Sequence, residues 1–171
     1  MRRHTHFVKA NLDPGTRRIV VLRLQKTFSL IPGEALDLFF SGTRKLSVRI
    51  LPDAGFPIGM RTTAGGPSGA RDCEIIVREE HCRFPEDLFI ASVLRELGHV
   101  VAGLPTEDEW PAARGDRARF KEQLECRADT MVWKWGLRHY GMRYLCATYP
   151  PHWVDRIVAD IERMLSEEEA N

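Results

Sequence analysis

The spacing of apolar residues divides the chain into a first part with short extended segments and a second part with long helical ones. Residues 18–24 are rich in β-branched side chains, and residues 46–51 alternate between apolar and polar, so both segments are predicted to be strands. A short helix is expected between them, over residues 34–40, because a Pro-Gly pair precedes it and a glycine follows it. Residues 58–63 and 73–78 are predicted to be two further strands.

Three longer segments have the spacing of helices. The first follows Pro85 and two acidic residues, which favour a helix N-terminus, and is expected to reach about Ala102. The second runs over residues 116–139 with apolar residues at helical spacing and is expected to end at Gly141. The third follows Pro150-Pro151. Strands first and helices afterwards predict an α+β domain with a small, mostly antiparallel sheet packed on helices.

The length and charge of the chain are consistent with one domain and a basic N-terminus. A chain of 171 residues is the size of one domain. Basic residues are concentrated near the N-terminus, so residues 1–17 are assigned to a basic arm and residues 18–171 to a single domain. A charged end is usually solvated, and an acidic or nucleic-acid partner for the arm is the alternative. The formal net charge of +1 gives the whole domain no electrostatic footprint for nucleic acid or anionic lipid.

The sequence predicts a cytoplasmic protein with no membrane partner. No apolar run approaches the length of a membrane span, and no apolar segment follows the N-terminal charges as it would in a signal peptide. The cysteines have no CxxC spacing and are predicted to be free thiols in a reducing compartment. They are Cys73, Cys82, Cys126 and Cys146.

The segment that points to chemistry is Arg95-Glu96-Leu97-Gly98-His99, in the middle of the first long helix. In an HExxH zinc site, two histidines one helical turn apart hold the metal, and the glutamate between them is the general base for a zinc-bound water. Here Glu96 and His99 stand at the base and second-histidine positions. Arg95 stands where the first histidine would be.

A second segment, residues 125–129 (ECRAD), lies on the next predicted helix. Together the two segments resemble the gluzincin clan of zinc metallopeptidases, and within it the ImmA/IrrE-like peptidases and minimal gluzincins. The resemblance covers residues 73–136 and implies a zincin-like architecture. It also implies that Glu125 is a zinc ligand with His99, that Glu96 is at the general-base position, and that Asp129 supports the residue at position 95.

Arg95 is the departure from the pattern of the clan. Its guanidinium does not lose its proton, and a unit charge ~5 Å from a divalent ion costs on the order of 6 kcal/mol at an effective dielectric of ~20. One guanidinium can instead bridge two carboxylates. We therefore expect no tight zinc binding at the usual place and expect Arg95 to bond both Glu125 and Asp129.

Three interpretations of function follow. The first is a catalytically inactive metallopeptidase-like domain without a cofactor, a pseudoenzyme that binds a protein or peptide in the former substrate cleft by strand addition. The second is an active zinc endopeptidase, a hydrolase in which His99 and Glu125 are joined by a third ligand. Candidates for that ligand are His81, Cys126, His139 and Asp129.

The third interpretation is an unrelated α+β interaction protein. In that case the motif belongs to a solvent-facing helix with ion pairs between successive turns, and Arg95, His99, Glu125 and Asp129 do not meet in space. The sequence leaves the choice between enzyme and binding module open, together with the oligomeric state.

Overall fold

The computed structural model describes residues 7–9, 14–41, 43–51, 59–62, 71–103 and 114–170. Helices make up most of this part of the chain. From the N-terminus the elements are β1 (Phe7–Lys9), α1 (Pro14–Leu30), α2 (Gly33–Ser41), β2 (Thr43–Leu51), β3 (Gly59–Thr62), β4 (Arg71–Arg78), the 3₁₀ helix η1 (Glu79–Arg83), α3 (Glu86–Ala102), α4 (Arg114–Lys134), α5 (Arg138–Thr148) and α6 (Pro151–Glu169).

The predicted fold class, an α+β zincin-like domain with a mostly antiparallel sheet, is wrong. The described strands have the order β1-β2-β4-β3, and β1 and β4 both pair with β2 in parallel. Only β3 and β4 are antiparallel. The helices α1 and α2 lie between β1 and β2 in the chain, and a helical connection of this kind lets two neighbouring strands run in the same direction.

The prediction of a strand over residues 18–24 is also wrong, because these residues are part of helix α1. Val20, Leu24 and Phe28 are buried and follow one another at intervals of one helical turn. The proposed boundary between residues 17 and 18 therefore falls inside α1. Of the basic arm, residues 1–6 and 10–13 lie outside the described residues.

The other predicted elements in the first part of the chain are confirmed as α2, β2, β3 and β4, and the first and third long helices as α3 and α6. The second long helix is shorter than predicted. It ends at Lys134, because Gly136 has a φ of 75°, a conformation that ends a helix. Gly141 lies inside α5, where a Cβ atom would be 2.6 Å from Nε1 of Trp133.

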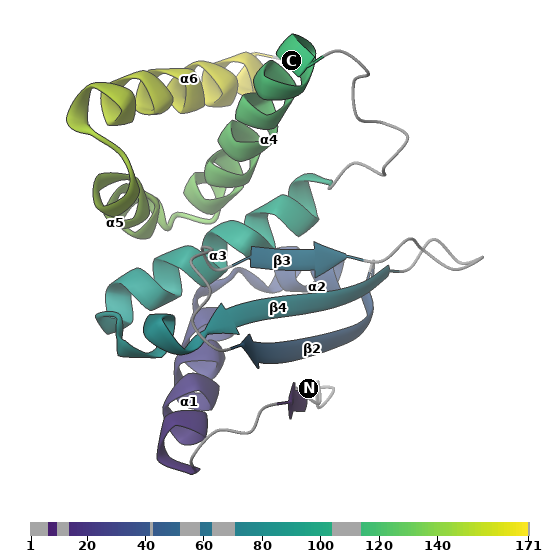
Figure 1. Cartoon of the computed structure of the whole chain (residues 1–171). Helices are drawn as coiled ribbons and strands as arrows, with labels where there is room; N and C mark the ends of the chain where they lie inside the picture. The colour runs from purple at the N-terminus through teal and green to yellow at the C-terminus, as the bar shows by residue number, and fades with distance from the viewer. Residues whose placement is uncertain are drawn as a thin grey trace.

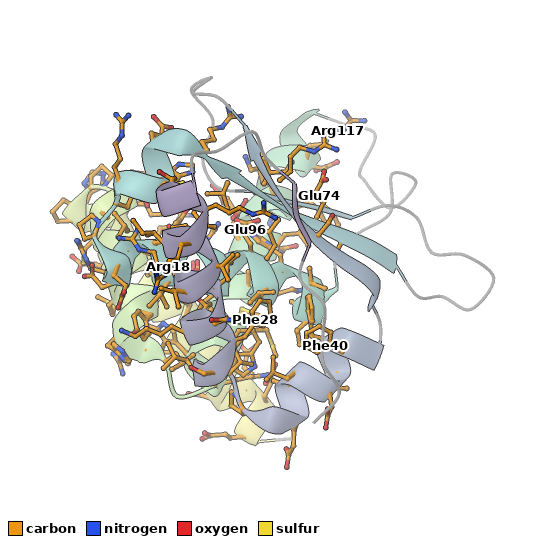
Figure 2. The ribbon with its side chains drawn as sticks, turned by 90° about the horizontal axis from the view of Figure 1, so that it is seen from below. Arg18, Phe28, Phe40, Glu74, Glu96 and Arg117 are labelled. Carbon is orange, nitrogen blue, oxygen red and sulfur yellow. The ribbon has the colours of Figure 1, made fainter. Side chains whose placement is uncertain are left out.

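Helices α2 and α3 lie behind the strands in Figure 1, α1 lies below them, and α3 separates the sheet from helices α4 to α6. The main core joins α1, α2, β4 and α3. Figure 2 shows Phe28 of α1 and Phe40 of α2 beside each other, with ring centroids 6.1 Å apart. A second, smaller core connects α4, α5 and α6 around Leu145 and Ile161.

None of the described helices combines the length and the apolar character that a membrane crossing requires. None of the four cysteines forms a disulfide.

Candidate functional site

Four side chains meet where α3 packs against α4. Arg95 and His99 lie one turn apart on α3, and Glu125 and Asp129 lie one turn apart on α4. Arg95, His99 and Asp129 are buried, with exposed fractions of 5%, 9% and 2%. The interpretation of this part of α3 as a solvent-facing helix is therefore wrong.

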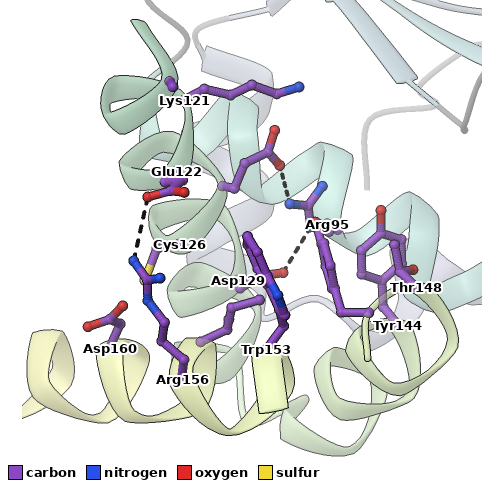
Figure 3. Close-up of a pocket in the computed structure, with 14 residues that line it drawn as sticks. Arg95, Lys121, Glu122, Cys126, Asp129, Tyr144, Thr148, Trp153, Arg156 and Asp160 are labelled. Atoms are coloured by element: carbon purple, nitrogen blue, oxygen red, sulfur yellow. Dashed lines mark hydrogen bonds and ion pairs between the residues drawn. The ribbon is translucent and has the colours of Figure 1, made fainter. Parts of the chain in front are cut away.

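Arg95 binds both carboxylates of α4, as the sequence predicted. Its Nε donates a hydrogen bond to Oδ1 of Asp129 at 3.0 Å, and its Nη2 donates to Oε2 of Glu125. The same Oε2 of Glu125 lies 3.2 Å from Nε2 of His99. Figure 3 marks the two bonds of the Arg95 guanidinium, one of them to Asp129, as dashed lines.

Two further groups surround the guanidinium. Its Cζ lies 4.7 Å from the centroid of the Tyr144 ring, a distance at which a cation is attracted to an aromatic face. Its Nη1 lies 4.0 Å from Oε1 of Glu96, the residue at the predicted general-base position. Arg95 is thus in contact with side chains from α3, α4 and α5.

The protonation of the cluster reflects its burial and its charges. Burial disfavours the charged form of Arg95, but Asp129 and Glu125 raise its pKa above the ordinary value. Burial would raise the pKa of Glu125, but the hydrogen bond from His99 and the charge of Arg95 lower it to about 2. For Asp129, burial outweighs the charge of Arg95 and raises the pKa.

The contact between α3 and α4 depends on Gly98, which has no side chain. A Cβ atom on Gly98 would lie 2.5 Å from the backbone oxygen of Ala128, closer than real Cβ contacts. The absence of a side chain at Gly98 permits this close approach of the two helix backbones. It brings the side chains of Arg95 and Asp129 within hydrogen-bonding distance.

Replacing Gly98 with alanine is expected to lower the free energy of unfolding by roughly 1–3 kcal/mol, because the backbone of α4 must move away. The matched control is Gly33→Ala, where nothing lies within 4 Å of the added Cβ and φ is not positive. Urea denaturation of the two variants measures the difference. Equal stabilities would contradict the close contact.

The residues present do not fit a zinc ion at the usual place. Within the described ranges, no group of three His, Cys, Asp or Glu side chains is arranged to hold a metal ion. His99 and Glu125 are adjacent, but Arg95 binds the glutamate oxygen that faces the histidine. Asp129, the third candidate ligand within the cluster, is also bound to Arg95.

The other candidate ligands have contacts elsewhere. His81 caps the start of η1, where its Nδ1 accepts a hydrogen bond from the backbone N–H of Arg78 at 3.2 Å. His139 is exposed and lies against the ring of Tyr140. The thiol of Cys126 lies 3.5 Å from the sulfur of Met164, and burial raises its pKa to about 11.

A cavity of about 470 Å³ adjoins the cluster between α4, α5 and α6, and Arg95 and Asp129 form part of its wall. Its other lining side chains include Lys121, Glu122, Tyr144, Tyr149, Trp153 and Arg156. Trp153 is 42% exposed. No motif in the sequence indicated that these side chains would line a common cavity.

No protein-family profile matches the chain, and neither a curated protein nor a solved structure is similar to it. Membership of the gluzincin clan therefore stays a prediction from the residues of this chain.

Proposed function

We propose that the chain is a catalytically inactive binding module in which Arg95 replaces the metal of a gluzincin-type site. The observation that supports this proposal is the pair of bonds from one buried guanidinium to Glu125 and Asp129. In the clan that the sequence resembles, these two positions hold a zinc ligand and the aspartate that supports another ligand.

Metal and guanidinium compete for the same atoms. Zinc between His99 and Glu125 requires the Oε2 atom of Glu125, which now faces both Arg95 and Nε2 of His99. The ion also adds two positive charges beside a buried cation. Because arginine does not lose its proton, deprotonation cannot remove the repulsion between the zinc ion and the guanidinium. The occupied carboxylates thus favour a site that holds no zinc.

Catalysis by Glu96 depends on the metal. The glutamate of an HExxH site removes a proton from water whose pKa the zinc has lowered. Without that ion, a carboxylate at the position of Glu96 has no activated water to deprotonate. Binding without hydrolysis is the function that this arrangement supports.

The sheet offers a place for a peptide. β3 is an edge strand of the described sheet and lies close to α3. The main-chain groups of an edge strand can pair with an extended peptide. A partner that adds a strand beside β3 would lie next to the helix that carries Arg95.

Elemental analysis and a peptide-hydrolysis assay test the proposal. After incubation with zinc and dialysis, the wild-type protein is expected to contain well below one zinc per chain. Any background hydrolysis should be unchanged in Glu96→Gln. About one zinc per chain, lost together with hydrolysis in Glu125→Ala, would establish the altered-ligand peptidase instead.

Peptides selected from a random library test the binding mode. If they bind by strand addition, methylation of alternate backbone nitrogens should abolish binding, while methylation of the intervening nitrogens should not. Equal tolerance at all backbone positions would contradict strand addition.

A further inference from the structure

A groove of about 400 Å³ lies between α4 and α6. It contains neither Arg95 nor Asp129. One stripe of α4 and one stripe of α6 line it, each with residues at helical spacing. The lining side chains are Arg119, Glu122, Gln123, Cys126 and Arg127 from α4, and Arg156, Asp160, Arg163 and Met164 from α6.

The groove has an excess of positive charge, because four arginines face two carboxylates. Arg163 donates a hydrogen bond to Asp160 at 2.9 Å. Arg156 is 3.7 Å from Glu122, and both of these side chains are more than half exposed. Arg119 and Arg127 are exposed and make no ion pair with any carboxylate in the described part of the chain. An anion can therefore bind there without displacing an existing partner.

Two of the side chains that line the groove, Cys126 and Met164, carry a sulfur atom and no charge. Cys126 and Met164 lie sulfur to sulfur at 3.5 Å. Burial raises the pKa of the Cys126 thiol to about 11, so the sulfur is neutral near pH 7. The sulfur atoms therefore leave the excess positive charge of the groove unchanged.

The groove is continuous with the 470 Å³ cavity beside Arg95, because four residues line both. These residues are Glu122, Cys126, Arg156 and Asp160. Figure 3 shows Arg156 reaching towards Glu122, with Trp153 close by. The Cζ of Arg156 lies 6.0 Å from the centroid of the Trp153 ring. A planar group stacked on Trp153 would thus lie at one end of a channel lined by arginines.

We propose that the groove and the cavity together bind a nucleoside polyphosphate. The base stacks on Trp153, and the phosphates extend along the groove past Arg119 towards Arg127 and Arg163. Guanidinium groups bind phosphate oxygens with paired hydrogen bonds. Arg119 and Arg127 are two helical turns apart, roughly 12 Å along the axis, so a chain of phosphates contacts both more readily than a single phosphate.

Titration calorimetry with adenosine, AMP, ADP, ATP and inorganic tripolyphosphate tests this proposal at low ionic strength. Affinity is expected to rise from AMP to ATP and to fall as salt is added. Arg127→Met combined with Arg163→Met should weaken ATP binding at least tenfold. Trp153→Ala should weaken ATP binding but leave tripolyphosphate binding unchanged.

The matched control is Arg143→Met, which removes the same charge from α5 outside the groove. ATP binding that is absent at millimolar concentration, or that falls equally in this control, would overturn the proposal. Tripolyphosphate binding as tight as ATP binding would do the same, because it would show that the ring adds nothing. The readout is the nucleotide affinity of the wild-type protein and its groove variants, so this result is independent of the zinc experiments.

Discussion

Arg95→Met is expected to lower the free energy of unfolding by about 3–5 kcal/mol, the usual cost of removing one partner from a buried ion pair. Methionine fills a similar length of space but leaves Glu125 and Asp129 without their cation. Asp129 is only 2% exposed, so little water reaches its carboxylate to replace the lost hydrogen bond. Urea denaturation at pH 7 measures the change.

An exposed pair gives the comparison. Arg163→Met removes a cation that bonds Asp160 on the surface of α6, where the two side chains are 64% and 39% exposed. Such pairs contribute about 0.2–1 kcal/mol, so this variant should stay close to the wild type. If Arg95→Met is no more destabilising than Arg163→Met, the buried cluster does not have the structural role described here.

The stability difference between wild type and Arg95→Met is also expected to depend on pH. In the wild type the pKa of Glu125 is lowered from 4.5 to about 2, so its contribution is present above the unfolded value and is lost as the pH falls towards 2. Without Arg95 this lowering is weaker. The gap between the two proteins should therefore be largest near neutral pH and should narrow between pH 5 and pH 2.

Arg95→His is expected to create a zinc site. The introduced imidazole would stand one turn from His99 on α3 and opposite Glu125, which gives the three protein ligands of a catalytic zinc site. Asp129 would accept the hydrogen bond of the new imidazole, as it now accepts that of Arg95. Dialysis against zinc should leave about one metal ion per chain.

Zinc should also stabilise this variant. Free zinc at 100 times the dissociation constant adds about 2.7 kcal/mol to the free energy of unfolding, whereas the wild type should not respond. The control is Arg95→His combined with Glu125→Ala, which removes one ligand and should abolish the effect. A folded Arg95→His protein that takes up no zinc would contradict the proposed relation to a gluzincin site.

The cluster was predictable from the sequence because both of its halves lie on helices. In a helix, residues four apart face the same way, so Arg95 with His99 and Glu125 with Asp129 each form a pair whatever the rest of the fold does. The contact between Gly98 and Ala128 then shows which faces of the two helices meet. The cavity between α4, α5 and α6 was not predictable, because it depends on how α5 and α6 pack against α4.

The strand predicted over residues 18–24 shows a limit of local reasoning. Ile19, Val20 and Val21 have a high propensity for strands, but burial of Val20, Leu24 and Phe28 on one helical face outweighs it. A window extending to Phe28 would have revealed the helical period.

That error led directly to the error in the sheet. Without α1, only a short helix separates the first predicted strands, and consecutive strands joined by short connections are usually antiparallel. The end of α4 was misplaced for a different reason. Gly136 and Gly141 are equally strong helix breakers by type, and only the backbone shows that Gly136 has the positive φ.

The single guanidinium shared by Glu125 and Asp129 makes the three positions epistatic. Loss of Arg95 alone leaves two buried carboxyl groups without a cation. Loss of either acid alone leaves a guanidinium N–H group without its acceptor. Mutational drift at any one position is thereby opposed by the other two. Substitutions at these positions are therefore expected to be tolerated in combination more often than one at a time.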